Sequence, residues 1–219
     1  MTIRPMLAAA ILSGLTMFAT AQAATITLTG SVSLSDVELS GALSAPQFDP
    51  TLGTLTGVTW SITGAIASII GISNDSAGPI TGSAFTSVDF NVASTVLSLG
   101  ASPDFNVFAS TGTVALGVGE SVLFPVTAFT TITGSEMVSA AFIGSSVFEV
   151  LYLTITSFGG SGFGGDVSIS QATDAGIDFS ITYEFETVAP EIPLPAAAPL
   201  MAAGLGALGL FGVRRRKRA

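Results

Sequence analysis

Residues 177–186 read IDFSITYEFE, a strict alternation of apolar and polar side chains. The apolar positions are Ile177, Phe179, Ile181, Tyr183 and Phe185. A period of two is typical of a β-strand with one face in the core and one face in water. β-branched and aromatic residues favour the same structure. The stretch therefore predicts a strand whose odd-numbered side chains are buried.

Shorter alternations elsewhere predict further strands with buried apolar faces. They comprise Ile26, Leu28, Val32 and Leu34; Val58, Trp60 and Ile62; and Leu151, Leu153 and Ile155. Glycine and proline clusters separate these segments, and no amphipathic helical pattern lies among them. Many short strands between such turns predict an all-β fold, an antiparallel β-sandwich with a jelly-roll-like arrangement as one option. The strand order stays open.

Two turn regions carry more specific expectations. The glycine-rich run 159–165 is expected to form a flexible hairpin loop. Phe48 is expected in the core, and Asp49-Pro50 is expected to open a turn that Gly53 closes.

The charges divide sharply by position. The six basic residues are Arg4 and, at the other end, Arg214, Arg215, Arg216, Lys217 and Arg218. Residues 25–190 contain no Lys, Arg, His or Cys but all except one of the fifteen acidic residues. Such a domain should repel nucleic acid, whose binding needs basic side chains, and should form neither disulfides nor thiolate metal sites. With no Lys to guard sheet edges, Asp36, Glu38, Glu184 and Glu186 are expected to guard them.

The same absences restrict catalysis. Nucleophilic catalysis needs a base to activate the nucleophile, and residues 25–190 offer no His, Lys or Cys. No catalytic residue is therefore predicted, and the domain is expected not to be an enzyme. Glycoside hydrolysis by paired carboxylates is the remaining enzymatic alternative. Its candidates are Asp36, Glu38, Asp49, Asp75, Asp89, Asp104, Glu120, Glu136, Glu149, Asp166, Asp174, Asp178, Glu184 and Glu186.

Calcium is the ion that fits these side chains best, because it takes carboxylate and carbonyl oxygens from loops. Asn74-Asp75-Ser76 and Gly164-Gly165-Asp166 could supply ligands, but neither segment matches an EF-hand loop or a glycine-aspartate repeat. Ordinary turns explain both segments as well. No cofactor is therefore predicted, with Ca²⁺ as the one candidate.

The N-terminal segment, residues 1–23, has the layout of a secretory signal peptide. Arg4 supplies the positive charge, residues 6–19 are mostly apolar, and Ala21-Gln22-Ala23 has small residues at the two positions that signal peptidase requires. Cleavage is expected after Ala23, with Ala24 as the alternative. An uncleaved N-terminal anchor is less favoured, because the apolar run is short for a bilayer-spanning helix.

The C-terminal segment, residues 191–219, has the layout of a membrane anchor. Residues 196–213 carry no charge, and the basic run Arg214–Arg218 follows directly. This predicts one transmembrane helix over about 195–213, with the basic run in the cytoplasm and residues 24–190 outside it. A plain anchor helix and a processed sorting signal both fit this pattern.

Two resemblances extend these expectations. Ile192-Pro193-Leu194-Pro195-Ala196, the apolar helix and the basic end together resemble the VPLPA-CTERM sorting domain, within the PEP-CTERM group of exosortase substrates. The resemblance implies that an exosortase-like membrane enzyme recognises Pro193, Leu194, Pro195 and Ala196. Residues 46–55, followed by Val58, are similar to the start of the choice-of-anchor E domain, which has no established activity.

The sequence thus predicts an exported, non-enzymatic protein of the cell surface or extracellular matrix. Export machinery, signal peptidase and an exosortase-like enzyme are its expected partners, with exopolysaccharide as a further candidate. The alternatives are a calcium-assisted module that binds polysaccharide or a cell surface, and the carboxylate-based glycan hydrolase. The expected location is the cell envelope, with residues 24–190 outside the cytoplasm.

Overall fold

The computed structural model describes residues 22–99, 104–187, 201 and 203–205. Gln22–Val188 forms one compact unit. Within the described part of the chain, no helix has both the length and the apolar character needed to cross a membrane. The predicted sorting motif, the basic run and Ala21 lie outside the described residues, as does most of the predicted transmembrane segment.

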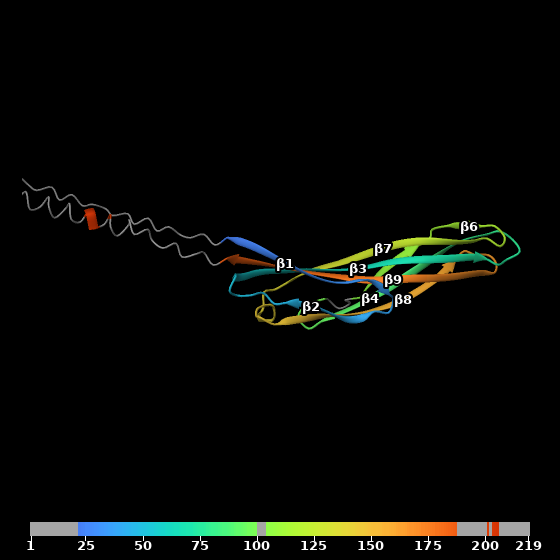
Figure 1. Ribbon diagram of the computed structural model, residues 1–219. Coiled ribbons are helices and arrows are strands. Elements are labelled where there is room, and N and C mark those ends of the chain that lie inside the picture. Colours follow the sequence, from blue (N-terminus) through green and yellow to red (C-terminus); the bar gives the residue numbers. More distant parts are fainter. Residues whose placement is uncertain (1–21, 100–103, 188–200, 202, 206–219) are drawn as a thin grey trace, which may run out of the picture. The chain divides into compact units, whose positions relative to one another are not determined.

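Nine strands make up the compact unit (Figure 1). They are β1 (Ala23–Asp36), β2 (Ser40–Pro46), β3 (Gly53–Asn74), β4 (Ile80–Ser94), β5 (Phe105–Ser110), β6 (Val114–Leu116), β7 (Ser121–Glu136), β8 (Val147–Ser161) and β9 (Val167–Thr187). A single 3-10 turn, η1 (Ala140–Phe142), precedes β8.

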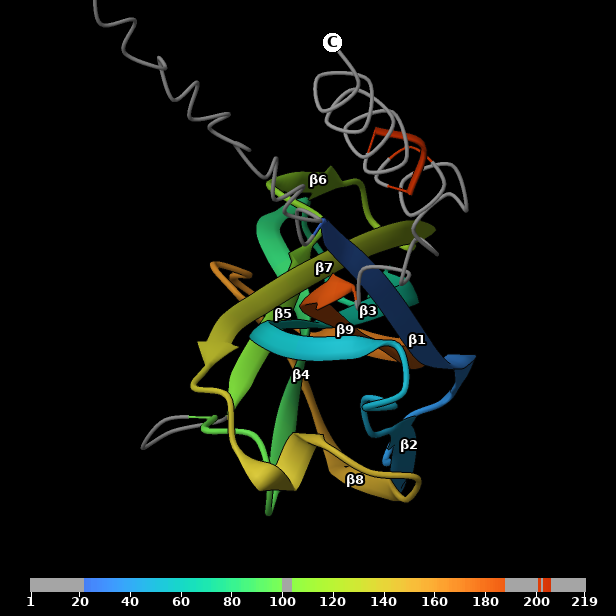
Figure 2. The ribbon, with the colours of Figure 1, turned by 90° about the vertical axis from the view of Figure 1, so that its left-hand side faces the viewer.

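The strands form two antiparallel sheets, here called sheet A and sheet B. Sheet A has the order β1-β9-β3-β7 and sheet B the order β2-β8-β4-β5, with β6 paired to the start of β4. The chain therefore changes sheet at six of the eight connections between these strands, and the first and last strands are neighbours. Figure 2 shows β1 and β2 on one flank of the two layers and β7 and β5 on the other. The all-β prediction is confirmed.

The core lies between the two sheets. All five apolar residues of 177–186 are buried in it, as their alternation predicts. Tyr183 donates a hydrogen bond from its hydroxyl to the Pro46 carbonyl oxygen over 3.0 Å, which joins β9 to the end of β2. Burial raises the pKa of this hydroxyl to about 12.

The buried apolar residues form two clusters with a polar layer between them. The larger cluster reaches Ile66, Val88 and Ala175, and the smaller begins at Ile70 and Ala84. Between them lie three buried hydroxyl residues from three strands: Ser68, Thr86 and Thr173. The Thr173 hydroxyl lies 2.6 Å from that of Ser68 and 3.3 Å from that of Thr86, so these groups satisfy one another.

The turn after β2 has the predicted form. Phe48 is buried and packs against Tyr183 and Phe185. The Thr51 backbone N–H donates a hydrogen bond to the Asp49 carboxylate over 2.9 Å. This bond, with a second from the Thr51 side chain, lowers the pKa of Asp49.

The face assigned to residues 151–155 is wrong. Leu151, Leu153 and Ile155 are 50%, 44% and 51% exposed on the outer side of β8. Phe148 and Val150 are buried instead and fix the opposite parity for the strand. A one-residue shift exchanges the two faces of a strand. The Thr154 side chain is therefore buried, and the row of Leu151, Leu153 and Ile155 faces solvent.

Two further expectations are also wrong. Gly159 and Gly160 belong to β8, where they pair with Phe85 and Ala84, so the loop begins only after Ser161. Glu184 and Glu186 guard no edge, because β9 lies between β1 and β3 inside sheet A.

Candidate functional site

The outer face of sheet A carries hydroxyl side chains in register across four strands. One row contains Thr27, Thr182, Thr59 and Ser135, and the next contains Thr29, Ser180, Ser61 and Thr133. These residues are far apart in the sequence and become neighbours because alternate residues of paired strands point to one side. This surface was not predicted from the sequence. The alternating Ser and Thr residues indicate it, but only the strand order shows which of them become neighbours.

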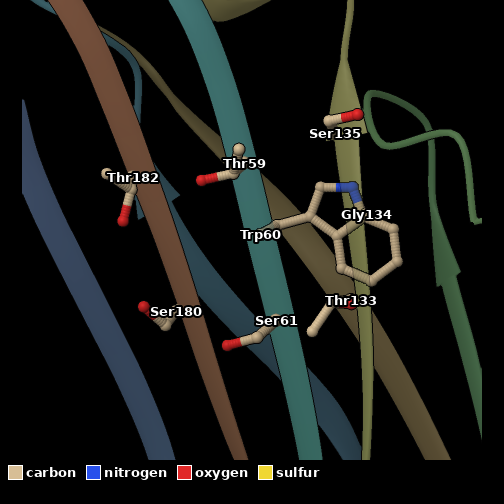
Figure 3. A pocket seen from close by; sticks show the side chains of 8 residues that line it. All are labelled: Thr59, Trp60, Ser61, Thr133, Gly134, Ser135, Ser180 and Thr182. Atoms are coloured by element: carbon tan, nitrogen blue, oxygen red, sulfur yellow. The ribbon is translucent and has the colours of Figure 1, made fainter.

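Three shallow hollows lie in series along β3 on this face, and they are called the β3 trough here. The first has a volume of about 520 Å³ (Figure 3). Its hydroxyl-bearing lining residues are Thr59, Ser61, Thr133, Ser135, Ser180 and Thr182. Hydroxyl groups donate and accept hydrogen bonds, so this hollow offers uncharged polar recognition.

The other two hollows continue the β3 trough with different linings. The second, about 490 Å³, is mainly apolar and includes Leu34, Ala65 and the exposed ring of Phe129. The third, about 280 Å³, combines hydroxyls such as those of Ser73 and Ser170 with apolar side chains such as the exposed Leu123. Hydroxyl and apolar linings therefore both occur along the strand.

Trp60 and Gly134 also border the first hollow (Figure 3), but the Trp60 side chain belongs to the core cluster and is only 7% exposed. The indole lies directly over Gly134 of β7, where a Cβ atom would come within 2.4 Å of the ring atom Cζ2. The indole N–H donates to Glu136 over 3.0 Å, and the same carboxylate oxygen accepts from the Ser98 backbone N–H over 2.6 Å. Gly134 thus leaves room for the indole to pack over β7 on the core side of sheet A.

The β3 trough has no acid–base machinery. None of its three hollows is lined by Asp or Glu, so the paired carboxylates of a glycosidase do not meet there. The carboxylates of Asp178 and Glu184 lie on the outer row of β9, exposed to water. The geometry supports binding by hydrogen bonds and apolar contact.

The two candidate calcium segments do meet, at one end of the compact unit. The Asp75 backbone N–H donates to the Asp166 carbonyl oxygen over 3.0 Å. The two carboxylate oxygens of Asp75 accept hydrogen bonds from Ser73 and Ser168, at 3.1 and 2.6 Å. The Asn74 amide donates to the carbonyls of Gly78, Leu116 and Gly117, and its oxygen accepts from Ser76.

These contacts explain the segments as a brace between turns. Asn74 is fully buried and ties the β3–β4 turn to the β6–β7 turn. Among the residues that the structure describes, no three Asp, Glu, His or Cys side chains are grouped to hold a metal ion. The carboxylate of Asp75 and the side-chain oxygen of Asn74 are therefore engaged within the protein.

Comparison with known proteins adds little. No protein family and no curated protein matches the chain. In the structure of the infectious bursal disease virus Gx strain, a chain is 12% identical over 85% of this chain and 42% of that one, with a TM-score of 0.19. A chain of the giant freshwater prawn Macrobrachium rosenbergii nodavirus particle is 10% identical over 87% of this chain and 97% of that one, with a TM-score of 0.20. A chain of Mud crab tombus-like virus is 7% identical over 92% of this chain and 97% of that one, with a TM-score of 0.20.

The chain thus spans less than half of the bursal disease virus chain that it matches. At TM-scores near 0.2 these likenesses carry no argument about this protein's fold or function.

Proposed function

We propose that this protein is an exported, non-enzymatic protein of the cell surface or extracellular matrix, delivered through its two terminal segments. One observation carries the proposal. Every basic residue of the chain lies near one of its ends, where each basic group adjoins an uncharged apolar stretch. A positive group followed by a short apolar run directs export of the chain. An apolar run followed by positive charge halts its transfer in the membrane and keeps the charged end in the cytoplasm.

The domain between these segments suits display better than catalysis. It has no His, Lys or Cys to activate a nucleophile. The β3 trough presents hydroxyls without carboxylates. The strand orders β1-β9-β3-β7 and β2-β8-β4-β5 favour a jelly roll as the detailed arrangement of the sandwich.

In this proposal each end has a defined fate. Signal peptidase cuts after Ala23, a helix over about 195–213 holds the chain in the membrane, and Arg214–Arg218 stay in the cytoplasm. An exosortase-like enzyme then recognises Pro193-Leu194-Pro195-Ala196. Prolines on both sides of Leu194 disfavour helix there and keep the segment extended and accessible to an enzyme.

Fractionation of matched variants tests the proposal. The wild-type chain should reach the envelope fraction and be degraded when protease is added to intact cells. A Pro193→Ala, Pro195→Ala double variant should still reach the membrane but keep its basic C-terminus. A control with Pro46→Ala, in a strand of the displayed domain, should be processed like the wild type. Protease resistance of the wild-type chain in intact cells would contradict export.

A second function, binding of an uncharged polysaccharide, is favoured by the β3 trough. Sugar rings offer hydroxyl edges and apolar faces, and the trough offers both hydroxyl and apolar side chains along its length. Calorimetric titration with a panel of neutral glucans and mannans, with and without Ca²⁺, tests this function. Ser61→Gln and Phe129→Ala should weaken binding, whereas Ser44→Gln on sheet B should not. Equal affinity of all three variants would exclude the trough as the site.

A further inference from the structure

The edges of both sheets are only half covered on the flank where β1 and β2 lie (Figure 2). β1 covers only residues 174–186 of β9, and β2 covers only residues 147–153 of β8. The connection between β1 and β2 then crosses the flank. The Leu39 backbone N–H donates to the Thr154 hydroxyl over 2.7 Å, and the Thr154 N–H donates to the Leu39 carbonyl over 2.9 Å.

Beyond this crossing, two strand segments have a neighbour on one side only. In the described part of the chain, residues 154–161 of β8 pair only with β4, and residues 167–173 of β9 pair only with β3. Apart from the Thr154 N–H, which is bonded to Leu39, their outer backbone groups face no other strand among the described residues. Such a row of unpaired N–H and C=O groups is a template for another strand.

The remaining sheet edges carry features that block strand addition. β1 is interrupted by an irregularity between Val32 and Ser35, and β7 contains Pro125. β2 has seven residues and ends at Pro46, and β5 has only six. Bulges, prolines and short length are the usual protections of an edge. Residues 154–161 have none of them.

The two uncovered segments differ in their flanking charges. Residues 167–173 lie directly between Asp166 and Asp174, which would face each other if two copies of this segment paired antiparallel. Residues 154–161, TITSFGGS, contain no charge. This stretch also carries a buried Thr156 hydroxyl oxygen without a hydrogen-bond partner, and the ring of Phe158 is 51% exposed.

We propose that residues 154–161 of β8 form a strand-addition site for the same residues of a second copy, paired antiparallel about a two-fold axis. A two-fold axis makes a segment its own partner, and antiparallel pairing places identical edges together. An uncharged extended segment suits this edge, because the domain carries fourteen acidic and no basic residues and the edge itself is free of charge. A pairing centred on Ser157 uses residues 155–159, which lie beyond the contact of Thr154 with Leu39.

Single cysteines test this pairing directly, because the chain contains no native cysteine. In the purified full-length chain in detergent, Ser157→Cys should form a disulfide-linked dimer on mild oxidation. Its two Cα atoms would lie about 4.5–5.5 Å apart, within reach of a disulfide. Ser44→Cys, also exposed but on the covered half of the flank, should stay monomeric. Adding Ile155→Asp should abolish the Ser157→Cys dimer, and adding Leu151→Asp should not.

Three outcomes would overturn the proposal: no dimer with a thiol that titrates as accessible, equal dimer from both cysteines, or a cross-linked partner whose mass is not that of this chain. A far-UV circular dichroism spectrum like that of the wild type shows that each variant is folded. The experiment needs neither export nor sorting, so its result is independent of the proposed function.

Discussion

Thr173 shows what a single buried hydroxyl does in this protein. It is the common partner of Ser68 and Thr86, which come from the two different sheets and make no other side-chain hydrogen bond. The three residues separate the two apolar clusters of the core. A buried polar group is tolerated only while it is paired, so the layer depends on Thr173.

Thr173→Val should lower the free energy of unfolding by about 1–3 kcal/mol, because it leaves two buried hydroxyls unpaired. Equilibrium unfolding in urea measures this change. The control is Thr131→Val, which removes an exposed hydroxyl paired with Thr63 and should change the free energy by no more than about 0.5 kcal/mol. Equal effects of the two substitutions would contradict the role given to the buried layer.

Tyr183 should make stability fall at high pH. Its pKa is raised from 10.0 to about 12, so between these values the folded chain keeps a proton that the unfolded chain has lost. The unfolded state then binds fewer protons, and stability decreases as pH rises. The contribution of the protonated Tyr183 hydroxyl to the free energy of unfolding is complete below pH 10 and is lost as the pH rises to 12. Its size is about 3 kcal/mol.

Urea unfolding of the wild type and of Tyr183→Phe between pH 9 and pH 12 tests this statement. The difference in unfolding free energy between the two proteins should shrink with pH. A difference that stays constant across the range would show that the Tyr183 hydroxyl does not hold its proton in the folded state.

β8 and β9 show what sequence alone could predict at the scale of an element. In β9 only one row of residues 177–185 is apolar, so period and face are both determined. In β8 both rows carry apolar residues, Phe148 and Val150 on one and Leu151 and Leu153 on the other. Alternation then predicts a strand but leaves the buried face undetermined, and pairing with β4 and β2 decides it.

Matched truncations in β8 test the assignment. Val150→Ala should cost about 2 kcal/mol of unfolding free energy, because a fully buried side chain is shortened. Leu153→Ala removes more carbon atoms from an exposed site and should cost no more than about 0.5 kcal/mol. The reverse order would mean that the faces of β8 are exchanged.

At the scale of the whole molecule, the main electrostatic feature is unbalanced negative charge. Fourteen carboxylates and no basic side chain lie within residues 25–190, and on β9 Asp174, Asp178, Glu184 and Glu186 share one outer row. The carboxylates repel one another without the relief of ion pairs. Screening weakens this repulsion, and the screening length is about 10 Å at 0.1 M salt.

Added salt should therefore stabilise the protein. Raising NaCl to about 0.5 M should increase the Tm of the purified chain by about 2–4 °C for each kcal/mol of relieved repulsion. A variant with Asp178→Asn and Glu184→Gln should start from a higher Tm at low salt and respond less. A Tm that falls with salt in both proteins would contradict the picture of mutual repulsion.

The candidate site marks the limit of prediction at this scale. The hydroxyls of Thr59, Thr133 and Ser180 are dispersed in the sequence, and only the order β9-β3-β7 brings them together. Composition could predict that nucleophilic catalysis is missing, since that prediction needs only the absence of His, Lys and Cys from residues 25–190. It could not place a surface that depends on the pairing of non-consecutive strands.

In the proposed function, both basic ends are addresses that frame an exported acidic domain. Intact-mass and terminal-peptide mass spectrometry of the chain recovered from its producing cells is the decisive measurement. We expect a mature chain that begins at Ala24 and lacks the basic run Arg214–Arg218, recovered outside the cytoplasm. A chain that carries both Met1 and Ala219 and is dissolved in the cytosol would contradict it.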